Sequence, residues 1–208
     1  VSDCPNHQTL RSTPLDTRYN VAAFGAFGYE INLCDLKNTQ LKEISQQIQL
    51  HKKWRDVFFA GDFYRIGERE WMVVSPDRKR AVAMIWNELS KPNDGPLLLK
   101  CAGLADEKTY HVYNIPLKHD VREFGNLVNM ISPVHVKQNS LLQDAIAKFV
   151  HMDGEKEDYT LSGAHLKRAG IELSQDFGGT GYAEPTRLFK DFASRMYYFE
   201  ETQEQASS

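Results

Sequence analysis

The chain has 208 residues, of which 41% are hydrophobic and 25% are charged, and its formal net charge is −3. This balance argues against a protein that binds nucleic acid or an anionic membrane, and no apolar run approaches the roughly 20 residues that span a bilayer. Cys4, Cys34 and Cys101 are far apart and form no Cys-x-x-Cys pair, so the sequence predicts neither a disulfide framework nor a zinc site, and it favours the cytoplasm.

The first nine residues read as a loop that leaves a β-strand. They hold a turn-forming Pro5-Asn6 pair followed by polar residues, with no initiator Met, basic leader or apolar signal stretch. We therefore expect a longer polypeptide to precede this loop. If the loop leaves the carboxyl end of a barrel strand, Asp3, Asn6 and His7 lie on the face where barrel enzymes place their active sites. The alternative is that these side chains fix the loop through hydrogen bonds to its backbone.

Two helices are expected next. Thr13-Pro14 is a helix-start signature, and Gly25 ends the first helix. A longer helix ends at Gly61 and is capped at its start by Asp35 or Asn38. Its apolar side chains recur at helical spacing and form one stripe: Leu41, Ile44, Ile48, Trp54 and Phe58. We expect this stripe to pack on the strands that follow or on another chain.

From residue 62 onward the pattern is that of short strands separated by turns. Residues 71–74 and 81–86 form an expected hairpin. An antiparallel sandwich is predicted by further short strands at residues 97–99, 110–113, 171–173 and 196–199. A helix is expected at 140–150, with Leu142, Ile146 and Phe149 on its apolar face.

The motifs that carry known chemistry are few. The run from Gly178 to Gly181 lacks the Lys-Ser/Thr of a phosphate-binding loop and is interpreted as a flexible connection. The acidic run 153–158 lacks the ligand spacing of a calcium loop and is interpreted as a solvated turn. The histidines include no pair at i and i+4, so no helical metal site is expected. Asp62 is a candidate acid or base, although a cap or an ion pair with Arg65 is the favoured interpretation.

Three stretches near the start carry a resemblance to a known family. They are Val1-Ser2-Asp3-Cys4-Pro5-Asn6-His7-Gln8-Thr9, the motif Arg11-x-Thr13-Pro14-Leu15-x-Thr17-Arg18, and Phe24-Gly25-x-Phe27-Gly28-Tyr29-Glu30-Ile31-Asn32-Leu33. In this order they resemble the end of the catalytic barrel in family 36 α-galactosidases, a family of glycoside hydrolases. The likeness to the long bacterial members continues through residues 61–65, 71–75, 153–160, 177–182 and 194–197, and so it covers nearly the whole chain.

The resemblance implies a mixed fold in two parts. Residues 1–60 would be the last loop and helices of a (β/α)₈ barrel, and residues 61–208 would be an all-β antiparallel sandwich at the C-terminal end of the enzyme. This order agrees with the pattern described above, in which helices come first and strands follow.

The resemblance also implies a reaction. Family members are retaining hydrolases of terminal α-linked galactose, as in melibiose, raffinose and stachyose, and they use one aspartate as nucleophile and a second as acid/base. The family carries these aspartates in Lys-Trp-Asp and Ser-Asp-x-Thr motifs, and neither motif occurs in this chain. Ser2-Asp3 is followed by Cys-Pro, so the acid/base role is not assigned to Asp3. We expect no catalytic residue here, an inactive chain, and substrate binding by Asn6 and His7 at most.

Cofactors and partners follow from the same resemblance. No metal or organic cofactor is implied, the expected ligands are α-galactoside oligosaccharides, and the intact enzyme is expected to be a homotetramer. The alternative is a non-catalytic module that binds carbohydrate or stabilises an oligomer. In that case exposed aromatic side chains would stack on sugar rings, with Trp71, Trp86, Tyr110 and Tyr113 as candidates, although alternating strands favour core packing for them.

Overall fold

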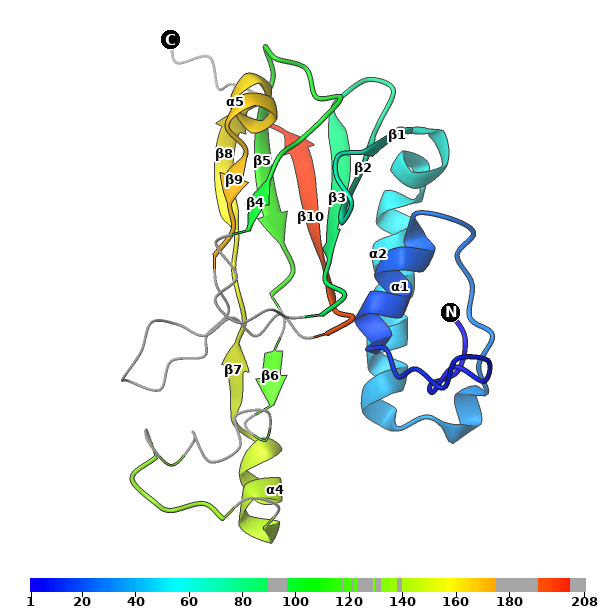
Figure 1. Ribbon diagram of the computed structural model, residues 1–208, viewed down its shortest axis with the longest axis vertical. Coiled ribbons are helices and arrows are strands. Elements are labelled where there is room, and N and C mark those ends of the chain that lie inside the picture. The colour runs from blue at the N-terminus through cyan, green and yellow to red at the C-terminus, as the bar shows by residue number, and fades with distance from the viewer. Residues whose placement is uncertain are drawn as a thin grey trace.

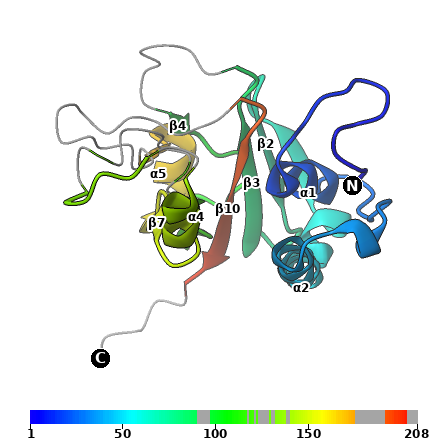
Figure 2. The ribbon, with the colours of Figure 1, turned by 90° about the horizontal axis from the view of Figure 1, so that it is seen from below.

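The computed structural model describes residues 1–89, 97–116, 118–120, 122, 129, 132–137, 140–174 and 191–202. Figure 1 shows a sheet with α1 and α2 along one side and with α5, β4 and β9 along the other. The view from below in Figure 2 shows the sheet between these two layers. The glycine-rich connection expected at Gly178–Gly181 and the polar tail after Thr202 lie outside the described residues.

Both expected N-terminal helices are present, but their first residues differ from the prediction. Helix α1 spans Leu15–Ala23 with Pro14 at its N-cap. Helix α2 spans Asn38–Ala60, and its N-cap is Lys37, whose backbone N–H donates to Gln40 Oε1 at 3.1 Å. The caps predicted at Asp35 and Asn38 are therefore wrong. Asp35 ends a short 3₁₀ turn, η1 (Leu33–Asp35), and Asn38 is already helical.

Gly61 ends α2 as predicted, and the reason is space. Its backbone N–H donates to the Val57 carbonyl at 2.9 Å. A Cβ at Gly61 would collide with that carbonyl oxygen and would lie 2.7 Å from the Val74 carbonyl oxygen. The close passage of the chain from α2 into the sheet therefore requires a residue without a side chain.

Six antiparallel strands form the main sheet, in the order β1-β2-β3-β10-β5-β8. The expected hairpin is confirmed, because Val74 lies opposite Ala81 and Met72 opposite Ala83. The strand near the C-terminal end of the chain pairs in the middle of the sheet, where Tyr198 lies between Val82 and Tyr113. The strands are β1 (Asp62–Arg65), β2 (Glu70–Val74), β3 (Arg80–Trp86), β5 (Thr109–Asn114), β8 (Asp158–Ser162) and β10 (Ser194–Glu201).

The layer opposite the helices is smaller than a full second sheet in the described residues. It consists of the pair β4 (Leu98–Leu99) and β9 (Ile171–Glu172) together with helix α5 (Gly163–Arg168). A second pair, β6 (Lys118–Asp120) with β7 (His151–Asp153), leads to helix α4 (Leu141–Ala147) and forms an arm that leaves the sheet at the lower end in Figure 1. The mostly antiparallel sheet agrees with the expected sandwich; the described residues also hold α4, a helix expected there, and the short α5, which the label all-β did not include.

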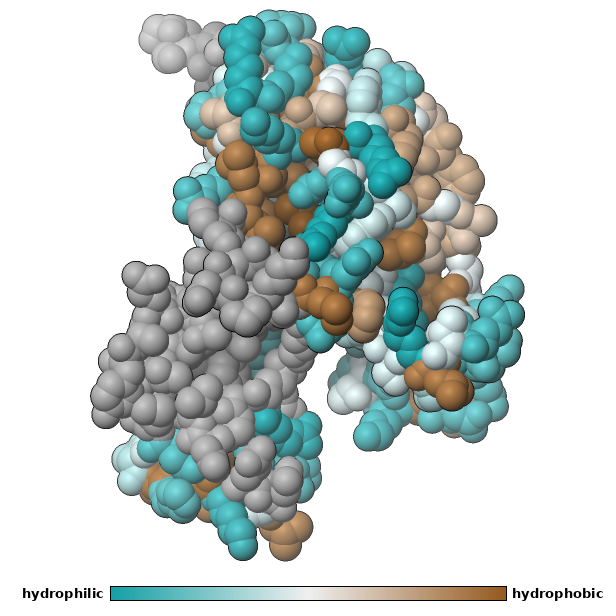
Figure 3. Space-filling view, viewed as in Figure 1, coloured by the Kyte–Doolittle hydropathy of each residue, from teal (hydrophilic) through white to brown (hydrophobic). Residues whose placement is uncertain are grey.

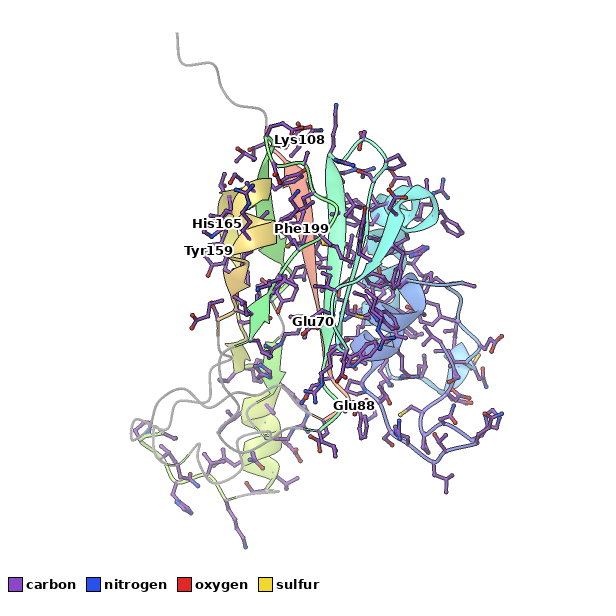
Figure 4. The ribbon with its side chains drawn as sticks, turned by 45° about the horizontal axis from the view of Figure 1, so that its top comes forward. Glu70, Glu88, Lys108, Tyr159, His165 and Phe199 are labelled. Atoms are coloured by element: carbon purple, nitrogen blue, oxygen red, sulfur yellow. The ribbon has the colours of Figure 1, made fainter. Side chains whose placement is uncertain are left out.

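Alternating side chains of the sheet build two cores, one on each face. Phe199, which Figure 4 places in the middle of the sheet, belongs to the core beneath β4, β9 and α5. Tyr198, the preceding residue, points to the other face and packs with Trp54 of α2, with 5.1 Å between the ring centroids. The second half of the stripe, with Trp54 and Phe58, thus packs on the sheet as expected, whereas Leu41 and Ile48 in its first half are only half-buried.

The helix expected at 140–150 is present as α4, but its apolar residues Leu142 and Phe149 are not the buried ones. Ser140 caps it by accepting a hydrogen bond from the Gln143 N–H at 3.2 Å. Gln143 is buried, whereas Leu142 is 49% exposed and Phe149, just beyond the helix, is 86% exposed. Periodicity thus indicated which residues share a face, but not which face turns inward.

The acidic run is another correction, because two of its side chains are buried. Glu155 is 4% exposed and Glu157 is 1% exposed. Glu155 accepts hydrogen bonds from Arg195 Nη1 at 2.7 Å and from Tyr197 Oη at 2.8 Å, and Glu157 Oε1 accepts one from the Ser174 N–H at 2.5 Å. The run therefore joins the base of the arm to β10 through an ion pair in the protein interior, and it is no solvated turn.

We expect removal of one hydroxyl from this network to destabilise the protein measurably. In Tyr197→Phe the Glu155 carboxylate loses a donor while it stays buried, which costs about 1.5–3 kcal/mol for a hydrogen bond to a charged group. Urea unfolding followed by circular dichroism measures the change. Tyr64→Phe, at a half-buried position on the same core, is the matched control and should change stability by less than about 0.5 kcal/mol. Equal stability of the two variants would contradict the assignment.

A candidate site at the edge of a parallel strand pair

The candidate site begins at the one parallel contact among the described strand pairings. Ser2 bridges Glu30 in parallel, and the Glu30 N–H donates to the Val1 carbonyl at 2.9 Å. Helix α1 lies between these two segments in the sequence, and α2 follows the second. Two parallel segments joined through a helix form a βαβ unit, in which both chains leave the same edge of the pair. The loops that follow Ser2 and Glu30 therefore emerge side by side.

The helices hold the two segments from behind. Arg18 Nη1, on α1, donates to the Ser2 carbonyl oxygen at 2.5 Å. Tyr29 Oη donates to Gln47 Oε1 of α2 at 2.5 Å, and Gln47 Nε2 donates to Glu43 Oε1 at 3.1 Å. Burial and the nearby Asp16 carboxylate raise the pKa of Glu43. These contacts place each loop relative to its own helix.

Asn6 organises the loop that follows Ser2. Its Oδ1 accepts from the N–H groups of Gln8 and Thr9, each at 3.0 Å, and from the Thr9 hydroxyl at 3.2 Å. Its backbone N–H donates to the Arg11 carbonyl at 2.9 Å. The alternative interpretation, in which side chains fix the loop through hydrogen bonds to its backbone, therefore holds for Asn6 Oδ1. The Asp3 and His7 side chains are exposed on the same loop, and substrate contact by Asn6 and His7 stays a prediction.

Replacement of Asn6 should loosen this loop without unfolding the domain. In Asn6→Ala the N–H groups of Gln8 and Thr9 lose their acceptor, so we expect their amide hydrogen exchange to become about tenfold faster, as the loss of roughly 1.4 kcal/mol of local stability implies. The thermal midpoint should hardly move. His7→Ala, in the same loop, is the control. Unchanged exchange at both amides in Asn6→Ala would show that the loop is held by other contacts.

The loop that follows Glu30 contributes two polar residues that sequence reasoning did not assign to the site. Asn32 Oδ1 accepts from the Cys34 N–H at 3.2 Å, and Asn32 Nδ2 donates to Asp35 Oδ2 at 2.7 Å. In the sequence, Asp35 was interpreted only as a possible cap of the second helix, and Asn32 was not singled out. Asn32 and Asp35 share the edge at which Asp3, Asn6 and His7 lie.

Asp62 lies far from this edge. It begins β1 at the opposite end of α2, and a helix of 23 residues is roughly 34 Å long. The ion pair predicted with Arg65 is wrong, because residues three apart on a strand point to opposite faces, and Arg65 Nε instead donates to the Gly67 carbonyl at 3.4 Å. Asp62 is exposed and is not the cap of α2, which ends at Gly61.

The four aromatic candidates for sugar stacking all take part in packing. Tyr110 is fully buried, and its hydroxyl donates to the Arg78 carbonyl at 2.7 Å. Trp71 and Trp86 are half-buried and meet edge to face, with ring centroids 4.4 Å apart. The Tyr113 hydroxyl donates to Glu200 at 2.7 Å. The core-packing interpretation is therefore confirmed most strongly for Tyr110.

His51 on α2 packs between aromatic rings. Its ring centroid lies 4.4 Å from that of Phe27 and 5.8 Å from that of Phe58, and its buried Nδ1 has no hydrogen-bond partner. Burial, followed by the charge of Arg55, lowers the pKa of His51. The neutral ring is therefore the form that fits this apolar setting.

Because of His51, the free energy of unfolding should decrease as the pH falls below about 6.5. Because the folded-state pKa is lowered, protons bind the unfolded chain better, so stability is full above the ordinary value near 6.5 and falls as pH drops below it. His51→Phe should lose less stability than the parent chain between pH 7.5 and 5.5, measured by urea unfolding at each pH. His7→Phe, at an exposed position, should follow the parent chain. A parallel loss in all three proteins would contradict the prediction.

Among the residues that the structure describes, no group of three or more His, Cys, Asp and Glu side chains is arranged to hold a metal ion. Cys4 and Cys34 are exposed free thiols, and burial raises the pKa of the Cys101 thiol to about 12. No helix among the described residues combines the length and the apolar character needed to cross a membrane.

The chain is similar in sequence to known glycosidases. Residues 68–199 match the model of the glycosyl hydrolase family 36 C-terminal domain, and residues 1–61 match the model named Melibiase. α-Galactosidase AgaA of Geobacillus stearothermophilus is 35% identical over 118 residues, which are 54% of this chain and 16% of that protein.

Solved structures agree on the fold. The α-galactosidase of Lactobacillus brevis superposes with a TM-score of 0.69 at 24% identity, over 100% of this chain and 23% of the other. An AgaA variant from Geobacillus stearothermophilus, solved in complex with stachyose, superposes with a TM-score of 0.65 at 24% identity, over 97% of this chain and 21% of the other. The chain thus spans less than a quarter of the length of the solved structures that it matches.

Proposed function

Because the chain belongs to glycosyl hydrolase family 36, we propose that it is the C-terminal part of an α-galactosidase that removes terminal α-linked galactose from oligosaccharides. The observation that carries this proposal is the parallel contact of Ser2 with Glu30, with α1 between the two segments and α2 after them. The order of a parallel segment, a helix and a second parallel segment is that of the repeating unit of a (β/α)₈ barrel, which supports the proposal. It coincides with the part of the chain that matches Melibiase.

In this proposal the two parts of the chain have different roles. Residues 1–60 contribute the last loops and helices of the catalytic barrel, and residues 61–208 contribute the C-terminal sandwich. The buried side chains of Trp54 and Val57 support these two roles, because they anchor α2 on the sheet. The sandwich then acts as a rigid support on the outside of the barrel.

The proposed reaction needs two carboxyl groups roughly 5–5.5 Å apart, one to attack the anomeric carbon and one to protonate the leaving oxygen. The chain contains neither the Lys-Trp-Asp nor the Ser-Asp-x-Thr motif, so both acids are assigned to polypeptide outside these 208 residues. The loops after Ser2 and Glu30 would form part of the rim of the sugar pocket. Asn6 Nδ2 and the exposed His7 ring are the groups proposed to meet the sugar hydroxyls.

The proposed substrates are melibiose, raffinose and stachyose. The support is that AgaA structures with 97% coverage of this chain are described in complex with stachyose and with raffinose. A homotetramer in the cytoplasm is part of the same proposal. It is supported by exposed apolar side chains on the arm, such as Leu141 at 88%, and by the free thiols of Cys4 and Cys34.

Kinetics of the complete polypeptide test the site. In the enzyme encoded by the whole reading frame, Asn6→Ala and His7→Ala should each raise the KM for raffinose by about two- to tenfold, the range expected for one neutral hydrogen bond. Glu68→Ala, at an exposed position between β1 and β2, is the control and should leave KM unchanged. An unchanged KM in both loop variants would contradict the proposal that Asn6 and His7 contact the substrate.

A further inference from the structure

A cleft separate from the strand-edge loops lies between the helices and the base of the arm. One wall is the start of α1 and the first half of α2, and the other is the end of β5 with Ile115 and Pro116. Its floor is the beginning of β10, where Met196 and Tyr198 lie. Its volume is about 1150 Å³. Figure 3 shows the hollow on the lower side of the molecule, where α2 and the arm diverge. We call it the α2–arm cleft.

The two cationic side chains that line the α2–arm cleft are already paired. Arg195 Nη1 lies 2.7 Å from Glu155 Oε2, and Lys53 Nζ lies 2.7 Å from Glu200 Oε1. Asn20 Nδ2 likewise donates to Ser194 Oγ at 2.9 Å. The floor therefore presents no unpaired cation for an anionic ligand.

The α2 wall carries the polar groups that face open space. Ser45, Gln46 and Gln49 line the cleft and are exposed, and Glu43 stands half-buried at its rim. Amide and hydroxyl groups donate as well as accept hydrogen bonds, which suits a ligand whose own groups do both. A cation would instead need acceptors alone.

Apolar side chains complete the lining. Leu50 is half-buried on the helix side, and Ile115, 53% exposed, and Pro116 form the opposite wall, whereas Leu15, Met196 and Tyr198 are buried beneath the surface of the cleft. Mostly apolar walls with a few polar groups on one side are typical of small-molecule sites. The C–H faces of a sugar ring match such walls, and its hydroxyls match the amides.

We propose that the α2–arm cleft binds a neutral oligosaccharide, as a second saccharide site apart from the loops at the parallel strand pair. The exposed polar side chains of α2 orient the hydroxyls, and Leu50, Ile115 and Pro116 contact the ring faces. This site goes beyond the proposed hydrolytic function, since it needs no catalytic carboxylate and lies within this chain.

Titration of the chain with stachyose, followed by two-dimensional NMR of the backbone amides, tests the proposal. Shifts are expected at cleft residues, among them Asn20, Gln47 and Ile115. The double variant Gln46→Ala, Gln49→Ala should bind about tenfold more weakly, since it loses two neutral hydrogen bonds at positions too exposed to affect folding. The control is Lys42→Ala, Lys52→Ala, two exposed α2 residues that do not line the cleft.

The other outcomes of the titration would each contradict the proposed second site. Shifts confined to residues 3–9 would place the sugar at the strand-edge loop, which would support the proposed function and reject the second site. Shifts with the apolar dye anilinonaphthalene sulfonate but none with stachyose would make the cleft an apolar docking surface. Equal affinity of the two double variants, or no shift at millimolar stachyose, would reject the site, whereas the hydrolytic proposal would stand on its own kinetics.

Discussion

The 208-residue chain should release no p-nitrophenol from p-nitrophenyl α-galactoside above the rate in buffer. Enzymes accelerate such reactions by at least about a millionfold, and glycoside hydrolysis draws this acceleration from a pair of carboxyl groups on either side of the scissile bond. The chain contains neither family motif that carries those groups. Its remaining site residues sit on two loops and offer amide, imidazole and isolated carboxylate groups.

This prediction has a direct control in the complete polypeptide. The enzyme encoded by the whole reading frame should hydrolyse the same substrate in the same buffer, at equal molar concentration. Turnover by the chain alone at a rate comparable with the complete enzyme would show that the catalytic pair lies within these residues. Asp3, Asp35 and Asp62 would then need to be examined as its members.

The largest effect on stability is expected from Trp54→Ala. Trp54 is fully buried between α2 and the sheet, where it contacts Tyr198 and belongs to the core with Val73, Val82 and Met84. Truncation of a buried tryptophan leaves a cavity and costs about 3–5 kcal/mol. A domain of this size is stable by only about 5–15 kcal/mol, so the variant should unfold at a much lower urea concentration or fail to fold.

Phe59→Ala is the matched control on the same helix. Phe59 is 75% exposed, so its removal should change stability by less than about 0.5 kcal/mol. Should Trp54→Ala itself prove too unstable to purify, Val57→Ala, one turn further along the buried stripe, supplies a milder cavity. Stability equal to the parent chain in both core variants would contradict the view that α2 is held by the sheet.

Features set by local sequence could be predicted well. The stripe that contains Ile44, Trp54 and Phe58 predicted α2 because helical periodicity is a property of neighbouring residues. The hairpin of β2 and β3 followed from a turn between two runs of β-branched and apolar residues. Gly61 ended α2 as expected, because β2 passes so close that a Cβ at this position would collide with Val73 and Val74.

Features set by distant contacts could not be predicted. The insertion of β10 between β3 and β5 depends on pairs such as Tyr197 with Ala83, more than a hundred residues apart. The burial of Glu155 depends on Arg195 and Tyr197, so its acidic neighbourhood suggested solvent instead. The apolar side of α4 is exposed because burial of a helix face depends on contacts with residues distant in sequence. Periodicity does not indicate which face makes those contacts.

Only the part of the candidate site that depends on local sequence could be predicted. The loop with Asn6 and His7 was found because turn residues followed a strand-like start. Asn32 and Asp35 were missed as site members because their proximity to that loop comes from the parallel contact of Ser2 with Glu30, a long-range pairing. The hydrogen bonds that occupy Asn6 Oδ1 emerged only from the structure.

The central claim is that residues 1–60 complete a catalytic barrel whose acidic pair lies elsewhere in the same polypeptide. Determining the coding sequence upstream of Val1 tests it most directly. We predict an open frame that continues upstream and encodes one aspartate in a Lys-Trp-Asp motif and another in a Ser-Asp-x-Thr motif. A start codon immediately before Val1, or an upstream frame that lacks both motifs, would contradict the claim.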